Sequence, residues 1–282
     1  MPLVNLDILL GFVQERKTIA PAFNTTNLET TLAIIEGIDE SGYPGIIQIA
    51  PTNAKLSDYS YIANIVKQKA SKIDTPISLH LDHGKSFEDV KNAVMAGFNS
   101  VMIDGASLSF EENIRLTKQA KDFCKCFHIP VEAELGAIKG KEDDNFDETD
   151  AKTDPTLVKE FVNRTGCDML AVSIGNVHGL DEQPQLDFKL LEQIANESPV
   201  PLVLHGGSGI STENLVKLRK YNVVKINIAS DIRRTFIQTI GTFYEKNHDE
   251  YNLIKVLQAA KQSVKDAVYK KTKLLNDSRL LS

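Results

Sequence analysis

The stretch ISLHLDHGKS, residues 77–86, places two histidines and an aspartate within four residues, directly after the run Ile77–Leu79. A short, largely apolar run of this kind is typical of a strand that is buried on both faces. His80, Asp82 and His83 therefore lie at the end of a predicted strand, Ile77–Asp82. Because α/β proteins build their sites at the carboxyl ends of strands, the other strand ends decide what these three residues do.

Seven further short apolar runs predict strands. They are Thr18–Asn24, Gly45–Ala50, Ser100–Asp104, Val131–Leu135, Met169–Ile174, Pro201–His205 and Val223–Ile228. Stretches with helical spacing lie between them, among them Leu28–Glu40, Phe87–Ala96, Phe110–Phe127 and Leu157–Thr165. Strands that alternate with helices form a parallel sheet, and eight such units favour a closed (β/α)8 TIM barrel over a doubly wound open sheet.

Size and composition predict one α/β domain over residues 1–282, because no linker or composition break divides the chain. From Ile232 onward we expect additional helices that pack on the barrel or on a neighbouring subunit. The net charge of −6 argues against nucleic acid as a partner, and no apolar run is long enough for a membrane helix. The N-terminus lacks the features of a signal peptide and the three cysteines form no framework of bridges, so we expect a cytoplasmic protein.

Histidines gather at the predicted strand ends. Four of the six histidines of the chain, His80, His83, His178 and His205, fall at or just beyond a strand end. Three imidazoles with an open fourth position are typical of a catalytic zinc site, and His83, His178 and His205 suit one because each follows a different strand. His80 precedes His83 on its strand, and we interpret it as a residue that supports a ligand or the core.

Asp82 directly precedes a candidate ligand. Successive residues of a strand face opposite sides, so we expect the side chain of Asp82 to point away from that of His83. A carboxylate beside a metal-bound substrate suits general acid/base catalysis, and the alternative is a partner that orients a histidine. The residues alone leave both interpretations open.

A candidate phosphate site follows the last two predicted strands. The turn HGGSGIS, residues 205–211, joins a strand to a helix, and its glycine backbone, the Ser208 hydroxyl and the helix start all favour an anion. The last strand adds Asn227, Ala229 and Ser230 at a second helix start. These two loops are the usual phosphate site of such barrels, so we expect a phosphorylated small molecule as the ligand.

Six motifs together, HLDHG, MIDGAS, VEAELG, SIGNVHG, LHGGSG and KINIAS, resemble those of class II (zinc-dependent) ketose-bisphosphate aldolases. Length and spacing are most similar to the subgroup of tagatose- and fructose-1,6-bisphosphate aldolases, and the resemblance runs from Met1 to about Ile240. It implies a dimeric or tetrameric enzyme that reversibly cleaves a ketose 1,6-bisphosphate to dihydroxyacetone phosphate and glyceraldehyde 3-phosphate.

The resemblance also implies residue roles. The catalytic Zn²⁺ would be bound by His83, His178 and His205, with Asp104 and Glu134 lining an alternative metal position. Asp82 would exchange a proton with the C4 oxygen, and Glu142, in the loop Gly136–Pro155, would take the C3 proton. The dihydroxyacetone phosphate moiety would be held by Gly179, Gly206, Gly207, Ser208, Asn227, Ile228, Ala229 and Ser230. A monovalent cation, Na⁺ or K⁺, is expected near Gly179 and Gly206.

Two departures from the family pattern concern the aldehyde half of the substrate. The arginine of a C-terminal motif is missing from the related stretch Asn252–Lys255, where Lys255 is the nearest cation, and Ala50 stands where some members have serine. We therefore expect an aldehyde other than glyceraldehyde 3-phosphate, or one held less tightly. The alternatives are a Schiff base on Lys225 in place of the metal, a zinc hydrolase on the same barrel, and a barrel without catalysis.

Overall fold

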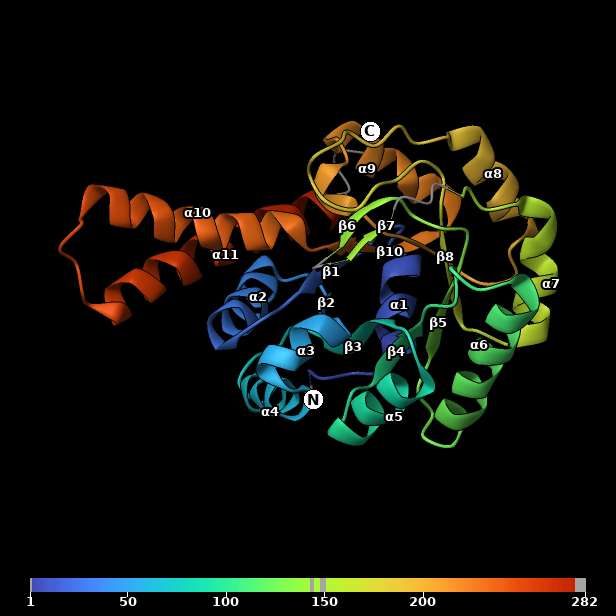
Figure 1. Ribbon diagram of the computed structural model, residues 1–282, viewed down its shortest axis with the longest axis horizontal. Coiled ribbons are helices and arrows are strands. Elements are labelled where there is room, and N and C mark those ends of the chain that lie inside the picture. The colour runs from blue at the N-terminus through green and yellow to red at the C-terminus, as the bar shows by residue number, and fades with distance from the viewer. Residues whose placement is uncertain (1, 143–144, 148–150, 277–282) are drawn as a thin grey trace.

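Eight parallel strands close into a barrel in a computed structural model that describes residues 2–142, 145–147 and 151–276 (Figure 1). The barrel strands are β1 (Ala20–Asn24), β2 (Gly45–Ile49), β3 (Ile77–Gly84), β4 (Ser100–Ile103), β5 (Val131–Leu135), β8 (Met169–Val172), β9 (Leu202–Leu204) and β10 (Val223–Ile228). They pair in this order around the barrel, and β10 pairs with β1 to close it. Closure confirms the predicted (β/α)8 barrel over the open sheet.

Helices cover the outside of the barrel, and two long helices form the C-terminal part of the chain. They are α1 (Leu6–Glu15), α2 (Leu28–Ser41), α3 (Pro51–Ser57), α4 (Tyr59–Ala70), α5 (Phe87–Ala96), α6 (Phe110–Lys125), α7 (Pro155–Thr165), α8 (Phe188–Glu197), α9 (Thr212–Leu218), α10 (Ser230–Lys246) and α11 (Leu253–Asn276), with short 3₁₀ turns at Gly207–Gly209 and Arg219–Tyr221. The predicted strands and helices all form, with ends shifted by at most two residues. Within the described residues, none of the helices has both the length and the apolar character needed to cross a lipid bilayer.

The amino-terminal half of the barrel interior is apolar. Side chains alternate along each strand, so that on β2 Ile46 packs inside the barrel while Ile47 joins the layer between strands and helices. Helix α1 closes this end of the barrel by burying Leu6, Leu9, Leu10 and Val13 against apolar inward side chains, which are Ala20, Ala22, Ile46, Met102, Met169, Ala171, Val203 and Val224. Because this plug closes the amino-terminal end of the interior, the interior is open to a ligand at the opposite mouth.

The carboxyl-terminal half of the interior is polar. Inward positions near the strand ends carry buried polar and charged side chains, which are Asn24, Gln48, His80, Asp82, Glu132, Glu134, Lys225 and Asn227. The same alternation that buries the apolar residues on the outer layer points these groups toward one another. The sequence pattern of the strands thus divides the interior into an apolar floor and a polar mouth.

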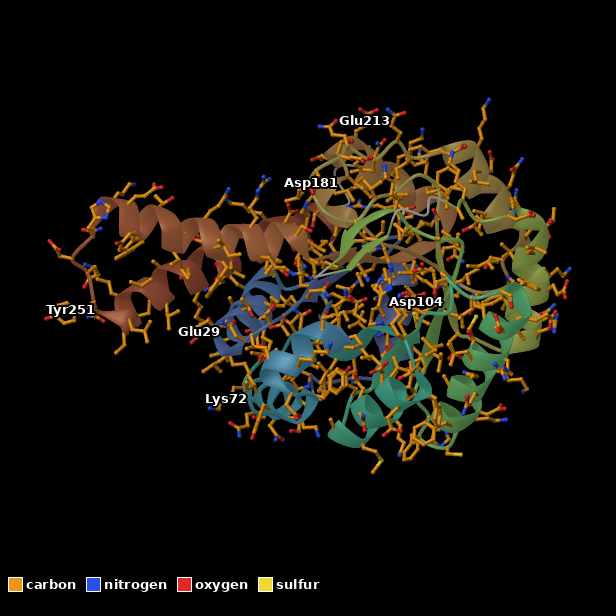
Figure 2. All side chains as sticks on the ribbon, in the orientation of Figure 1. Glu29, Lys72, Asp104, Asp181, Glu213 and Tyr251 are labelled. Carbon is orange, nitrogen blue, oxygen red and sulfur yellow. The ribbon has the colours of Figure 1, made fainter. Side chains whose placement is uncertain are left out.

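Helices α10 and α11 form an arm that reaches well away from the barrel (Figure 1). The arm is attached where α11 packs on α2, and an added Cβ at Gly37 of α2 would lie 2.7 Å from the Lys265 carbonyl oxygen, so the two helices approach closely there. Large apolar side chains near the outer end are exposed, at 95% for Tyr251, 67% for Leu253 and 69% for Ile254. Figure 2 shows Tyr251 at the end of the arm opposite the barrel.

Candidate active site

The three histidines that the sequence singles out converge at the open mouth of the barrel. His83 lies at the end of β3, His178 in the loop after β8, and His205 directly after β9. Their ligand nitrogens all lie within 4.8 Å of one another, and the ring centroids of His83 and His205 are 4.6 Å apart. Three converging imidazole nitrogens are a suitable donor set for a divalent transition metal.

Asp82 and His83 face the same site, so the expectation that they point apart is wrong. Nε2 of His83 lies 4.0 Å from Oδ1 of Asp82. The alternation of side chains breaks because His83 adopts a left-handed φ of 43° and the pairing of β3 with β4 shifts register between Leu81 and Gly84. A left-handed conformation at a non-glycine residue costs roughly 1–3 kcal/mol. The surrounding structure therefore imposes this bend, and the bend adds His83 to the site.

The other nitrogen of His83 is held by Asp104. Oδ2 of Asp104 lies 2.7 Å from Nδ1 of His83 and also accepts a hydrogen bond from Lys85. Burial raises the pKa of Asp104, but the hydrogen bonds and charges of His83 and Lys85 outweigh it and hold that pKa well below its usual value. An ionised Asp104 binds the Nδ1 proton of His83, so Nε2 is the nitrogen available to a metal.

Glu132 holds His205 in the same way. Nε2 of His205 lies 2.9 Å from Oε1 of Glu132, which leaves Nδ1 as the second ring nitrogen. Burial and the neighbouring His83 ring lower the pKa of His205, so its imidazole is neutral near pH 7, as a metal ligand must be. Asn176, in the loop after β8, donates to the His205 carbonyl oxygen at 3.2 Å and so ties the loop that carries His178 to His205.

A buried ring nitrogen without a hydrogen-bond partner indicates whether these residues fit a metal. Nδ1 of His205 has no hydrogen-bond partner among the described residues, and Oε2 of Glu134 lies 3.4 Å from it. Leaving a buried nitrogen unsatisfied is costly, and a metal ion would remove that cost. The donor set therefore fits a divalent metal. His83, Asp104 and Glu134 also meet the 4.8 Å limit, so the alternative metal position has its donor atoms close together.

Asp82 is fully buried and held by two amides. Asn24 donates to Oδ2 at 2.7 Å, and Asn227 donates to Oδ1 at 2.9 Å. Gln48 donates in turn to Asn24 at 2.7 Å. Two N–H donors favour the ionised carboxylate and fix its orientation. Asp82 thus presents a carboxylate next to the histidines, in a position suited to proton transfer.

His80 lies beneath the three histidines, inside the barrel. Its Nδ1 is 2.7 Å from the Ser100 hydroxyl, and its Nε2 is 3.5 Å from Oε2 of Glu132. Burial and the charge of Lys225 lower the pKa of His80 well below its usual value. His80 therefore packs as a neutral ring against Glu132, in line with its interpretation as a supporting residue.

A small pocket beside the histidines matches the predicted phosphate site. Its lining residues are His178, Gly179, Gly206, Ser208, Asn227, Ala229, Ser230 and Arg233. Gly206 has φ 72°, and an added Cβ there would lie 2.1 Å from the Val177 carbonyl oxygen. The Ser208 hydroxyl accepts a hydrogen bond from the Asp231 N–H in the first turn of α10. The pocket therefore combines a close backbone approach with a helix start, the features that favour an anion.

Two of the predicted substrate-binding residues, Gly207 and Ile228, are not among those that line the pocket. The Ile228 side chain packs in the outer core and so faces away from the pocket. Gly207 is buried, and an added Cβ there would lie 2.7 Å from Cγ1 of Ile226. Asn227 lines the pocket, but its amide is hydrogen-bonded to Asp82 and Lys225. Besides Asn227, the predicted polar groups at the pocket are thus the backbone of Gly179 and Gly206 and the hydroxyls of Ser208 and Ser230.

Sequence reasoning missed Arg233, which lines the phosphate pocket and also a larger neighbouring cavity. The signal was available, because Arg233 lies one helical turn after Ser230 and so faces the same way. The roles of Glu132 and Lys225 were missed as well: both are fully buried and their side chains form an ion pair of 2.8 Å. No local pattern identifies such a pair, since 93 positions separate its members.

The loop Gly136–Pro155 contains a β-hairpin whose base touches a candidate metal ligand. β6 (Gly140–Glu142) pairs with β7 (Asn145–Asp147), and the His178 N–H donates to the Lys139 carbonyl oxygen at 2.9 Å. Glu142 is the last residue of β6, and its side chain lies outside the described part of the structure. The backbone thus places this strand at the site, and the role of Glu142 stays a prediction.

A cavity of about 600 Å³ adjoins the phosphate pocket. Gly179, Ser230 and Arg233 line both spaces. Arg234 and Asp181 line the cavity but not the phosphate pocket. Its apolar lining residues are Leu56, Leu180, Ile232, Phe236 and Ile237. Lys255 lies elsewhere, in the first turn of α11 at the outer end of the arm, where its ammonium is 2.7 Å from Oε2 of Glu250. The Asp104 and Tyr251 labels in Figure 2 show how far the arm end lies from the barrel.

Comparisons with known proteins agree with this arrangement. A family model described as fructose-bisphosphate aldolase class-II matches residues 4–279. The YdjI aldolase of Escherichia coli K12 is 32% identical over 98% of this chain and 99% of its own, with a TM-score of 0.86. A Coccidioides immitis protein assigned as a fructose-1,6-bisphosphate aldolase is 30% identical over 95% of both chains, also at 0.86.

A third solved structure supports the fold alone. The fructose-bisphosphate aldolase of Campylobacter jejuni is 21% identical over 97% of this chain and 95% of its own, with a TM-score of 0.84. Identity and coverage in the first two structures, and a family match over nearly the whole length, lead to one assignment. The chain belongs to the class II fructose-bisphosphate aldolase family and is a lyase.

Proposed function

We propose that the chain is a zinc-dependent aldolase that reversibly cleaves fructose- or tagatose-1,6-bisphosphate to dihydroxyacetone phosphate and glyceraldehyde 3-phosphate. The observation that carries this proposal is the convergence of three histidine nitrogens next to the Asp82 carboxylate and beside a glycine-rich anion pocket. A phosphorylated ketose needs each of these three parts, because its phosphate must be held, its carbonyl polarised and a hydroxyl proton removed.

The residues divide the reaction between them. Zn²⁺ held by His83, His178 and His205 would act as a Lewis acid for the negative charge that carbon–carbon cleavage leaves beside the carbonyl. Asp82 takes the C4 hydroxyl proton during cleavage and returns it during condensation, while its two amide partners hold the carboxylate in place. Glu142 exchanges the C3 proton, a role that rests on the resemblance.

The phosphate of the dihydroxyacetone half binds in the small pocket. Backbone groups of Gly179 and Gly206, the Ser208 hydroxyl and the start of α10 surround it, and Arg233 adds a positive charge. A Na⁺ or K⁺ ion near Gly179 and Gly206 belongs to the same proposal and would offset part of the phosphate charge.

The aldehyde half is the part of the proposal with a competing candidate. Cavities of a few hundred Å³ hold drug-sized ligands, so a space of about 600 Å³ admits an aldehyde longer than three carbons. The departures at Ala50 and Lys255 point the same way. The alternative is therefore an aldolase that acts on another ketose 1-phosphate. A zinc hydrolase on the same barrel, the remaining alternative, has no observation in its favour.

We further propose that the protein is a homodimer or homotetramer that uses the α10–α11 arm. The exposed Ile237, Tyr244, Tyr251, Leu253 and Ile254 lie along the same projecting arm, and large apolar side chains gathered in this way mark protein contacts. A second copy of the chain is the proposed occupant, because symmetric pairing lets the same surface on two copies cover itself.

The three cysteines are free thiols, which supports a cytoplasmic location.

Metal removal tests the zinc requirement. Treating the enzyme with a strong chelator should lower the cleavage rates of fructose- and tagatose-1,6-bisphosphate by at least about 100-fold, because the proposal assigns the developing negative charge to the metal. Adding Zn²⁺ should restore the rates, and chelator already saturated with zinc is the control. A metal-free enzyme that keeps its full rate contradicts the proposal.

Replacing Asp82→Asn tests the proton transfer. We expect kcat to fall by about 10²–10⁴-fold, the usual contribution of a general acid/base, while the bound zinc stays at the wild-type stoichiometry. Asp122→Asn, at an exposed position on α6, is the control. A kcat within threefold of wild type contradicts the assignment of Asp82 as the general acid/base. Loss of zinc together with activity supports the alternative in which Asp82 orients a histidine.

A panel of aldehydes tests the aldehyde half. In condensation with dihydroxyacetone phosphate, we expect glyceraldehyde 3-phosphate to exceed unphosphorylated glyceraldehyde in kcat/KM by less than about tenfold, because the family arginine is missing and one charge-assisted contact is worth about 1.5–3 kcal/mol. Longer aldehydes should have a kcat/KM equal to or above that of glyceraldehyde 3-phosphate. A clear preference for glyceraldehyde 3-phosphate at low concentration argues against the altered aldehyde half.

Light scattering after size-exclusion chromatography tests the assembly. Wild type should elute with at least twice the 31.2 kDa of one chain. The double variant Leu253→Asp/Ile254→Asp should shift toward the monomer, because it places charge in the proposed apolar contact. Met95→Asp, at an equally exposed site on α5, should leave the mass unchanged. A monomeric wild type at micromolar concentration contradicts the proposal.

A further inference from the structure

Lys225 is a charged residue with no place in the proposed reaction. It lies on β10 inside the barrel with none of its surface exposed. Burying an ammonium group is costly unless it is paired and hydrogen-bonded, so a lysine here needs a reason. Among the described residues, those that line the phosphate pocket and the adjoining cavity do not include Lys225. The Schiff-base alternative loses support, because the nitrogen is fully buried and bonded to Glu132 and Asn227.

The Lys225 ammonium makes two short hydrogen bonds to different parts of the site. It donates to Oε2 of Glu132 at 2.8 Å and to Oδ1 of Asn227 at 2.7 Å. Glu132 lies on β5 beneath His205, whereas Asn227 lies two residues along β10 beside Asp82. One buried cation thus joins the metal-binding half of the site to its acid/base half.

The Glu132 branch ends on a proposed metal ligand. Oε1 of Glu132 lies 2.9 Å from Nε2 of His205, so the carboxylate holds the Nε2 proton and turns Nδ1 toward the other histidines. Burial raises the pKa of Glu132, but the charge of Lys225 and the bond to His205 outweigh it and hold that pKa well below its usual value. Without the cation, Glu132 would be a buried negative charge with only neutral partners.

The Asn227 branch ends on the proposed acid/base. The amide of Asn227 can orient in two ways, and only one of them presents N–H to Asp82. The bond from Lys225 requires the oxygen on the Lys225 side, which fixes Nδ2 on Oδ1 of Asp82 at 2.9 Å. Asn24 holds the other carboxylate oxygen independently at 2.7 Å. Lys225 therefore sets one of the two contacts that orient Asp82.

We propose that Lys225 is a positioning residue that fixes, through Glu132 and Asn227, both the metal-facing nitrogen of His205 and the carboxylate of Asp82. The inference rests on the proposed metal-dependent reaction. A comparable chain, Lys85 to Asp104 to His83, exists at the ends of β3 and β4, but the Lys85 side chain is 57% exposed and the solvent screens its charge. Lys225 differs because its charge is buried and it serves two functional groups.

The test compares removal of the buried ion pair with loss of the lysine from an ion pair outside the barrel. Lys225→Met leaves Glu132 uncompensated and is expected to unfold, so the double variant Glu132→Gln/Lys225→Met, which removes both charges, carries the test. Lys121→Met is the control, because it breaks a lysine–aspartate contact of 2.5 Å to Asp168 outside the barrel. Zinc affinity is measured by chelator competition, and the ligand field by the visible absorption of the Co²⁺ form.

We expect the folded double variant to bind zinc about 10–100-fold more weakly, the usual effect of losing a group that orients a ligand. The Co²⁺ absorption should change as well. At saturating zinc, kcat should fall at least tenfold while KM stays within threefold, because Lys225 does not touch the substrate. Lys121→Met should change none of these values.

A double variant that keeps either its zinc affinity or its kcat at saturating zinc within threefold of wild type overturns the proposal. The proposed function fails separately, if wild-type enzyme binds zinc but cleaves no ketose phosphate. In that case the zinc affinity and the Co²⁺ spectrum of the double variant decide the role of Lys225 alone.

Discussion

The pairing of buried charge in the upper half of the barrel is the constraint on which the site depends. Asp82, Glu132 and Lys225 are fully buried, and taking each charge out of water costs several kcal/mol unless a partner offsets it. Each therefore has partners: two amides for Asp82, His205 and Lys225 for Glu132, and Glu132 and Asn227 for Lys225. These hydrogen bonds and ion pairs fix the orientations of the buried side chains, which flexible surface side chains would not maintain. The groups of the site that they contact are fixed as well.

Barrel closure is what makes this pairing possible. Inward positions of eight strands meet in a small interior, so groups on β3, β5 and β10 and directly after β9 reach one another across it. Apolar side chains and helix α1 fill the lower half and exclude water there. The polar groups consequently collect at the other end, where the strand ends and their loops provide further partners.

Local strain adds the last element of the metal-binding group. A regular β3 would turn His83 to the outer layer, because it follows the inward-facing Asp82. The left-handed φ of His83 and the register shift against β4 bring both side chains to the mouth. The cost of roughly 1–3 kcal/mol is offset by the surrounding contacts, among them the bond from Nδ1 to Asp104.

The sequence by itself determined the eight strands, their alternation with helices and most residues at the mouth. These features follow from apolar periodicity and from position at a strand end, which are local properties of the sequence. Only the tertiary structure decided that Asp82 and His83 face one way, that Lys225 pairs with Glu132 93 positions earlier, and that Arg233 joins the phosphate pocket. It also placed Ile228 in the outer core and Lys255 at the far end of the arm. These outcomes depend on which distant groups meet when the barrel closes, and on where a strand must bend to let them meet, so no stretch of neighbouring residues encodes them.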